Sequence, residues 1–182
     1  MVTLRSPRRG GSNQILRAGV AADATFGFLD DSTGYWAWVE SYTDESGIPV
    51  QKVSNFPVKP GDTVSVLVAA DGPGNGTAFL RNSRTGMGTS VWIKLPPDIK
   101  SPGVTTTWAV EAGPADLPLF GDVTFTNYWA GSLIEGSSEC FTLQPGAEIL
   151  NMYTAAQDEP LTSTAILSPN SFKVTQLGWG FD

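Results

Sequence analysis

Residues 34–42 read GYWAWVESY, and large apolar side chains alternate along them with smaller or polar ones. Successive side chains of a β-strand point to opposite faces of a sheet. One face of this strand would therefore hold three aromatic rings and one carboxylate: Trp36, Trp38, Glu40 and Tyr42. Aromatic surface beside an acid is typical of the lining of a binding groove. An exposed glutamate beside ordinary core aromatics is the alternative that the pattern alone leaves open.

The rest of the chain repeats this organisation. Strand-length segments are separated by turns rich in Gly and Pro, and helix signals are scarce. The expected strands are residues 13–22, 34–42, 62–70, 77–83, 89–95, 105–112, 121–129, 148–154 and 171–177. Such spacing indicates an all-β sandwich or barrel. We expect one domain over residues 1–182, in which residues 1–12 are a flexible or atypical N-terminal segment.

Composition excludes several classes of function. The net charge is −7; residues 1–17 hold four arginines and no acid, so the rest carries 7 basic and 18 acidic residues. A domain this acidic repels phosphate backbones, so we expect no nucleic-acid partner. The chain has no His, which excludes Ser–His–Asp and Cys–His catalysis and histidine metal sites. We expect no metal and no cofactor, and the absence of an apolar run of 18 residues predicts no membrane span.

A second alternating stretch, TTTWAVEAG at residues 105–113, contains a single carboxylate, Glu111. Alternation places Glu111 with Thr107 and Ala109, on the face opposite Trp108 and Val110. Small neighbours would leave the carboxylate accessible on a crowded sheet. A strand glutamate that simply points to solvent is the other interpretation, and a catalytic acid or base is the sharper one.

Several stretches taken together resemble the eqolisins, the glutamic peptidases of filamentous fungi and some bacteria. YWAWVESY at residues 35–42 is similar to the family segment YxAWYExYP, and WAVE at 108–111 with LFGDVTFTN at 119–127 is similar to WIVE…FGxVTFTN. PGD at 60–62, the hairpin from GTAFL to RTG at 76–86, and LTSTAIL…SFKVTQ near the C-terminus also fit. The resemblance runs from about residue 10 to residue 177.

The resemblance implies a jelly-roll, concanavalin-like sandwich of two antiparallel sheets, with a substrate cleft on the concave sheet. It implies a secreted acid endopeptidase, by default a monomer, whose substrate is a polypeptide. The family's catalytic glutamate corresponds to Glu111. It would take a proton from water and return it to the leaving amine, while a glutamine amide donates to the oxyanion. Trp36, Trp38, Glu40 and Tyr42 would contact the substrate.

The sequence departs from the family at the catalytic glutamine. The family segment resembles LLQAGV, and the stretch here is ILRAGV at residues 15–20, which places Arg17 at the glutamine position. Gln14 is three residues away, an odd offset that points it to the opposite face of a regular strand. An arginine beside Glu111 would favour the ionised carboxylate, yet a guanidinium can also donate to an oxyanion. Family domains also begin several tens of residues earlier, so we expect an N-terminal truncation.

Three alternatives to peptide-bond hydrolysis therefore remain open. The chain could be an impaired relative that binds a peptide or a hydrophobic ligand in its groove. The scaffold could carry another reaction, because a fold does not fix a function. A carbohydrate-active site could use Glu40 and Glu111 as a carboxylate pair, which retaining chemistry requires at about 5–5.5 Å.

Overall fold

A computed structural model of the chain describes residues 2–5, 14–23, 34–43, 47–70, 75–94, 105–111, 120–131, 140–141, 147–153 and 159–177. The chain divides into two compact units, Met1–Glu111 and Ala112–Asp182. That the 182 residues act as one domain stays a prediction. Within the described ranges, no helix has the length and apolar character that a membrane crossing requires.

The first unit contains eight strands in its described part. They are β1 (Val2–Arg5), β2 (Gln14–Asp23), β3 (Gly34–Thr43), β4 (Gly47–Pro57), β5 (Val64–Ala70), β6 (Asn75–Asn82), β7 (Gly88–Lys94) and β8 (Thr105–Trp108). They form a five-stranded sheet of order β4-β3-β2-β1-β8 and a three-stranded sheet of order β5-β6-β7. All of the pairings are antiparallel.

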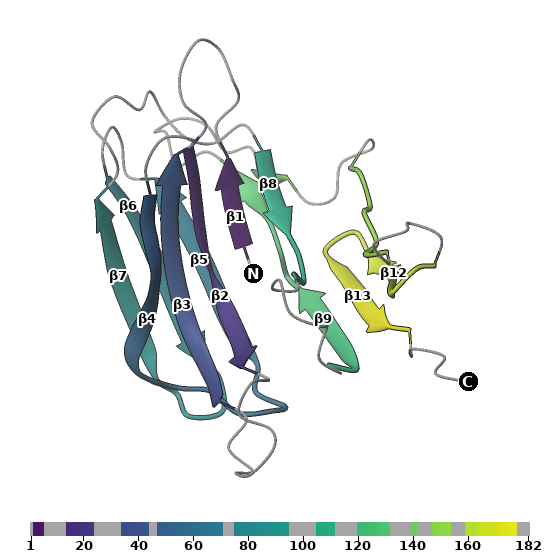
Figure 1. Ribbon diagram of the computed structural model, residues 1–182, viewed down its shortest axis with the longest axis horizontal. Coiled ribbons are helices and arrows are strands. Elements are labelled where there is room, and N and C mark those ends of the chain that lie inside the picture. The colour runs from purple at the N-terminus through teal and green to yellow at the C-terminus, as the bar shows by residue number, and fades with distance from the viewer. Residues whose placement is uncertain are drawn as a thin grey trace. The chain divides into compact units, whose positions relative to one another are not determined.

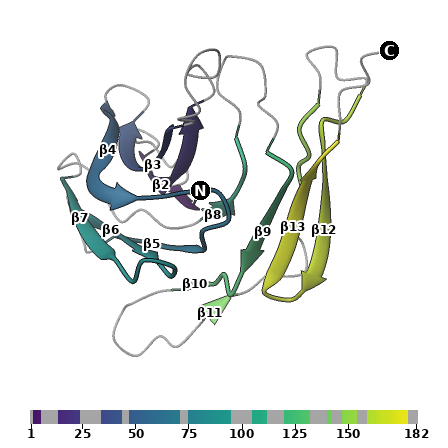
Figure 2. The same ribbon diagram turned by 90° about the horizontal axis from the view of Figure 1, so that it is seen from below.

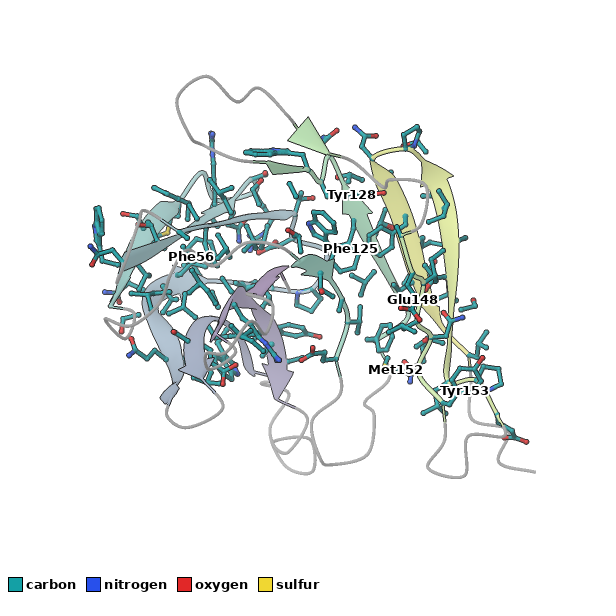
Figure 3. The ribbon with its side chains drawn as sticks, turned by 90° about the horizontal axis from the view of Figure 1, so that it is seen from above. Phe56, Phe125, Tyr128, Glu148, Met152 and Tyr153 are labelled. Carbon is teal, nitrogen blue, oxygen red and sulfur yellow. The ribbon has the colours of Figure 1, made fainter. Side chains whose placement is uncertain are left out.

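The two sheets of the first unit enclose an apolar core (Figures 1 and 2). Alternation along each strand sends every second side chain inward. The core consists of Leu16, Ala18, Ala37, Val39, Val53, Phe56, Val68, Ala78, Leu80 and Ile93. Phe56 lies between the sheets (Figure 3). The predicted all-β sandwich is confirmed, and the described residues contain no helix.

Strand β1 occupies a position that the sequence pattern did not suggest. It falls within residues 1–12 and pairs with β2 on one side and with β8 on the other (Figure 1). The stretch VTLR has only four residues, too few for alternation to be distinguished from chance. Its place in the sheet decides how far β8 lies from β2.

Strand β4 also lies outside the expected segments. Its sequence, GIPVQKVSNFP, contains two prolines, which weaken a strand assignment. The β3–β4 register shifts twice, between Trp36 and Trp38 and between Val39 and Ser41, so β4 is a bulged edge strand. Asn55, within the first of these irregular stretches, has φ of 59°, the left-handed conformation that asparagine tolerates better than most residues.

The second unit has a sheet of its own. Strands β9 (Asp122–Thr126), β12 (Thr162–Ser168) and β13 (Ser171–Gln176) form an antiparallel sheet of order β12-β13-β9, and β10 (Ala130–Gly131) pairs with β11 (Cys140–Phe141). The Phe172 ring stacks on Phe125 at 4.6 Å between centroids and meets Tyr128 edge-on at 5.4 Å. Figure 3 shows the labelled Phe125 and Tyr128 beside β13.

Residues 148–153 do not form the strand that we expected there. They contain only an isolated bridge between Tyr153 and Pro160. The amide of Met152 donates to the Thr162 hydroxyl at 2.9 Å, and its carbonyl accepts from Leu161 at 2.7 Å. Because a side chain takes one of the bonds that a strand neighbour would take, no regular ladder forms at Met152.

Candidate active site

A row of four residues crosses the five-stranded sheet. Arg17 of β2 pairs with Glu40 of β3 on one side and with Thr3 of β1 on the other, and Thr3 in turn pairs with Thr107 of β8. Residues that are directly opposite in an antiparallel sheet project to the same face. The register therefore places Arg17 and Glu40 as cross-strand neighbours, although 23 positions of sequence separate them.

The same register assigns the aromatic residues to this face. Leu16, Ala18, Ala37, Val39 and Ser41, on the opposite face, are each at most 2% exposed and lie in the core. The residues that alternate with them are half-buried, except for Ile15 and Gly19, which are buried. We call this second set the Arg17 face: Ile15, Arg17, Gly19, Trp36, Trp38 and Glu40. The alternation that predicted a common face for Trp36, Trp38 and Glu40 agrees with the burial pattern.

Arg17 and Glu111 form an ion pair at this face. Nη1 of Arg17 donates to Oε2 of Glu111 over 3.1 Å, with the two side chains 21% and 51% exposed. Strand β8 ends at Trp108, the partner of Val2, and Ala109–Glu111 continue without strand pairing. Arg17 reaches past β1, two strand spacings of about 4.8 Å each, to meet Glu111. Glu111 is therefore accessible to solvent and lies beside the guanidinium of Arg17.

The comparisons with known proteins identify the family and the fold. Residues 9–176 match the model of the Peptidase A4 family, which is the eqolisin family. This chain belongs to the Peptidase A4 family. The crystal structure of aspergilloglutamic peptidase from Aspergillus niger is similar in fold, with a TM-score of 0.68 and 21% sequence identity, and the match covers 97% of each chain. No curated protein matches the chain.

Two predicted site residues of this eqolisin-family chain are placed only through their backbones. The β2–β3 ladder runs from Gln14 to Asp23 without a bulge, so position 14 stays at an odd offset from Arg17. Tyr42 pairs with Ile15 in the same ladder. The side chains of Gln14 and Tyr42 lie outside the described part of the structure. No irregularity in β2 would bring position 14 to the Arg17 face.

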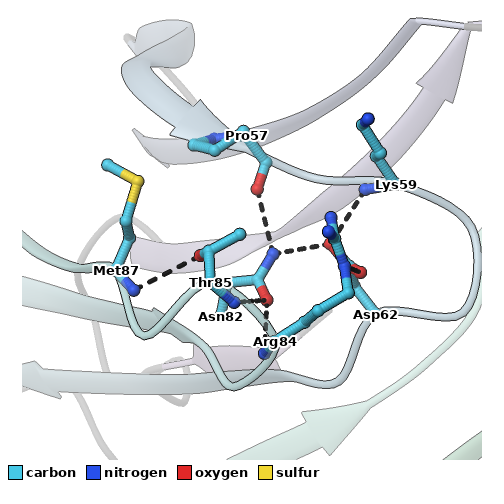
Figure 4. A network of polar contacts seen from close by, with 7 residues as sticks. All are labelled: Pro57, Lys59, Asp62, Asn82, Arg84, Thr85 and Met87. Atoms are coloured by element: carbon cyan, nitrogen blue, oxygen red, sulfur yellow. Dashed lines mark hydrogen bonds and ion pairs between the residues drawn. The ribbon is translucent and has the colours of Figure 1, made fainter.

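A second polar cluster of the eqolisin-family chain holds the edge strand β4 in place beside Trp36. Asn82, buried at the end of β6, donates from Nδ2 to the Pro57 carbonyl at 3.0 Å and to Asp62 Oδ2 at 2.6 Å. Its Oδ1 accepts from the Arg84 amide at 2.9 Å (Figure 4). Pro57 is the register partner of Trp36. The side-chain amide of Asn82 thus links the three-stranded sheet to β4, at the edge of the five-stranded sheet.

Asp62 is the charged centre of this cluster. Its side chain is 1% exposed and forms an ion pair with Arg84 through Nε, with a second contact from Nη2 at 3.1 Å (Figure 4). The Asp62 carboxylate also accepts the Lys59 amide at 3.0 Å. The hydrogen bond from Arg84, with those from Asn82 and Lys59, holds the pKa of Asp62 well below its usual range against the opposing effect of burial. The carboxylate stays charged in acid.

Sequence reasoning quoted PGD and RTG as family motifs and missed the side chains that join them. The sequence places Asp62 and Arg84 near glycines in two turn segments, and that placement could have suggested the pair. In the structure both glycines have positive φ, Gly61 at 80° and Gly86 at 71°. Two such turns can meet at one end of a sandwich, where an acid and an arginine form a pair. That they meet depends on the register of β5 with β6, in which Val64 pairs with Asn82.

Proposed function

We propose that this chain hydrolyses peptide bonds in polypeptides, with Glu111 as general base and then general acid. Glu111 takes a proton from a water molecule, whose oxygen attacks the carbonyl carbon of the scissile bond. An N–H of the Arg17 guanidinium donates to the carbonyl oxygen, which becomes an oxyanion. Glu111 returns the proton to the leaving nitrogen, and the C–N bond breaks to give a carboxylic acid and an amine.

The observation that supports this proposal is the single contact between Arg17 and Glu111. It engages Oε2 of Glu111, and among the described residues nothing hydrogen-bonds to Oε1. A bidentate pair would occupy both carboxylate oxygens, whereas this pair leaves one oxygen for a water molecule. The same contact holds a guanidinium within hydrogen-bond reach of the group that would activate the water. The family resemblance, which implies an amide donor at position 17, supports the same role for Arg17.

The Arg17 face would bind the polypeptide. Trp36 and Trp38 are half-buried, so their rings offer apolar surface to substrate side chains, with Glu40 and Tyr42 on the same strand. We expect the pH optimum of hydrolysis to lie in acid, because protonation of carboxylates there brings the net charge of −7 at pH 7 closer to zero. The family resemblance further supports a secreted monomer, which detection in culture medium and size-exclusion chromatography would check.

The test is digestion of an unfolded protein between pH 2 and pH 7. The variants are Glu111→Gln, Arg17→Gln and, as a matched control, Glu148→Gln, which removes an exposed carboxylate in the second unit. We expect cleavage by the wild type and the control, and cleavage at least about a hundredfold slower by Glu111→Gln. A wild type that cleaves nothing at any pH would refute hydrolysis by this chain.

A second candidate function is polypeptide binding without hydrolysis, which the ion pair itself favours. If Arg17 holds Glu111 permanently, the base is neutralised and the Arg17 face only binds. Cleavage that appears in Arg17→Gln and is absent from the wild type would select this function. Fluorescence of Trp36 and Trp38 would then follow the binding of an unfolded polypeptide, and the variant Trp38→Ala would weaken it.

A further inference from the structure

Glu40 lies directly opposite Arg17 in the β2–β3 ladder, on the same face. Cβ atoms of such a pair are about 4.5–5.5 Å apart, within reach of an ion pair between a glutamate and an arginine. Both side chains are half-buried. Glu40 nevertheless makes no hydrogen bond or ion pair with the described side chains, whereas Arg17 contacts Glu111 at 3.1 Å. Two carboxylates thus flank one guanidinium.

The proposed reaction makes conflicting demands on Arg17. Glu111 becomes neutral when it takes the proton from the water molecule, so its ion pair with the guanidinium weakens at that step. A half-buried cation whose ion pair with one carboxylate weakens is stabilised by a second carboxylate nearby, because burial penalises charge. Glu40 is the carboxylate that the register places opposite Arg17.

We propose that Glu40 is a positioning residue, which receives the Arg17 guanidinium when Glu111 releases it. The inference rests on the proposed function for its role in catalysis, and on the sheet register for the contact itself. Glu40 then keeps the guanidinium beside the Arg17 face, where it donates to the oxyanion while the protonated Glu111 passes its proton to the leaving nitrogen. The replacement of the family's neutral glutamine by an arginine is what makes a second carboxylate useful here.

Lys52 is the other cation near Glu40 on this face. It is exposed and pairs with Trp38, and the β3–β4 register shifts between Val39 and Ser41, on either side of Glu40. Glu40 therefore has no register partner on β4, and Lys52 is only a diagonal neighbour. Arg17 stands directly opposite, so the experiment must separate the two cations.

Equilibrium unfolding in urea provides a test that needs no activity. Glu40→Gln is made in the variant Glu111→Gln, which lacks the Arg17–Glu111 ion pair, and again with Arg17→Gln or Lys52→Gln added. We expect Glu40→Gln to lower the folded-to-unfolded ratio about two- to fivefold in Glu111→Gln. This loss of stability should disappear when Arg17→Gln is added and persist when Lys52→Gln is added. The effect of the control Glu148→Gln on stability should not depend on residue 17 or residue 52. An effect that ignores residue 17, or that disappears with Lys52→Gln, overturns the inference.

A crystal structure of Glu111→Gln gives a second, independent readout. We expect a guanidinium nitrogen of Arg17 within ion-pair distance of the Glu40 carboxylate, and an arginine turned into solvent would contradict the proposal. In the active protein, Glu40→Gln should lower kcat more than it raises KM, and only while residue 17 is arginine. If the wild type cleaves nothing, the unfolding comparison still decides the contact. If the wild type cleaves and the unfolding experiments show no coupling between Glu40 and Arg17, the proposed role of Glu40 is wrong and the proposed function stands.

Discussion

Arg17 and Glu111 are 94 positions apart in the chain, yet Nη1 of the first donates to Oε2 of the second over 3.1 Å. Strand β1 pairs with β2 and with β8, so it sets the distance that Arg17 spans. The family resemblance implies that these two side chains stand at the positions of the family's amide donor and catalytic glutamate.

Glu111→Gln removes the carboxylate with almost no change in volume. We expect hydrolysis to fall by a hundredfold or more, because general base catalysis contributes about 10²–10⁴-fold. The free energy of unfolding should change by less than about 1 kcal/mol, since a partly exposed ion pair contributes little. Initial rates on an unfolded protein and urea unfolding measure the two effects. Equal rates in wild type and variant would remove Glu111 from the mechanism.

Arg17→Ala and Arg17→Gln should behave differently. Alanine removes the oxyanion donor, so we expect the rate to fall about 10²- to 10³-fold. Glutamine restores the family's neutral donor and frees Glu111, so its rate should at least match that of the wild type. The ratio of kcat/KM between the two variants measures the donor's contribution. Similar losses in both would mean that no donor acts from position 17.

Asn82→Ala should destabilise the first unit by about 2–3 kcal/mol, because it breaks buried hydrogen bonds to the Pro57 carbonyl and the Asp62 carboxylate. Asn75→Ala is the matched control, since Asn75 is exposed on the same strand, and we expect a change within about 0.5 kcal/mol. Chemical denaturation of both variants gives the two values. A loss no larger than that of the control would show that the cluster is dispensable.

Asp62→Asn should reveal a pH-dependent contribution to stability. The pKa of Asp62 is lowered in the folded chain, chiefly by the hydrogen bond from Arg84. Its contribution is therefore fully present above the unfolded pKa of about 3.9 and is lost as pH falls through the lower folded pKa. Wild type should be the more stable protein at pH 5–7, and the difference should shrink below about pH 4. Unfolding curves at each pH measure it; a difference that stays constant from pH 7 to pH 2 contradicts this assignment.

Ser41→Ala should stabilise the chain or leave it unchanged. Ser41 is 1% exposed on the core face of β3, and among the described residues its hydroxyl has no hydrogen-bond partner. Removing an unsatisfied buried polar atom recovers about 1 kcal/mol. The thermal midpoint of Ser41→Ala is compared with that of Ser65→Ala, which changes an exposed serine on β5. A marked loss of stability in Ser41→Ala would show that the hydroxyl is bonded.

The strands that the sequence located are those in which alternation is long and uninterrupted. Residues 34–42 were expected and β3 runs from Gly34 to Thr43, because alternation over nine residues is unlikely to arise by chance. Strand β4 was not predicted, because Pro49 and Pro57 argue against a regular strand, and β4 is a bulged edge strand that tolerates them. Residues 148–153 were expected as a strand and form only a bridge, since the Thr162 hydroxyl takes the Met152 amide.

Within the candidate site, the sequence by itself determined which residues share a face of one strand. Trp36, Trp38 and Glu40 stand together because side-chain direction in a strand is a local property of the backbone. The partners of those residues were decided only by the tertiary structure. Whether Arg17 meets Glu111, stands opposite Glu40, or does both depends on the register of β2 with β3 and on β1 between β2 and β8. Register arises from the packing of whole sheets, and a shift of one residue would have sent Arg17 into the core.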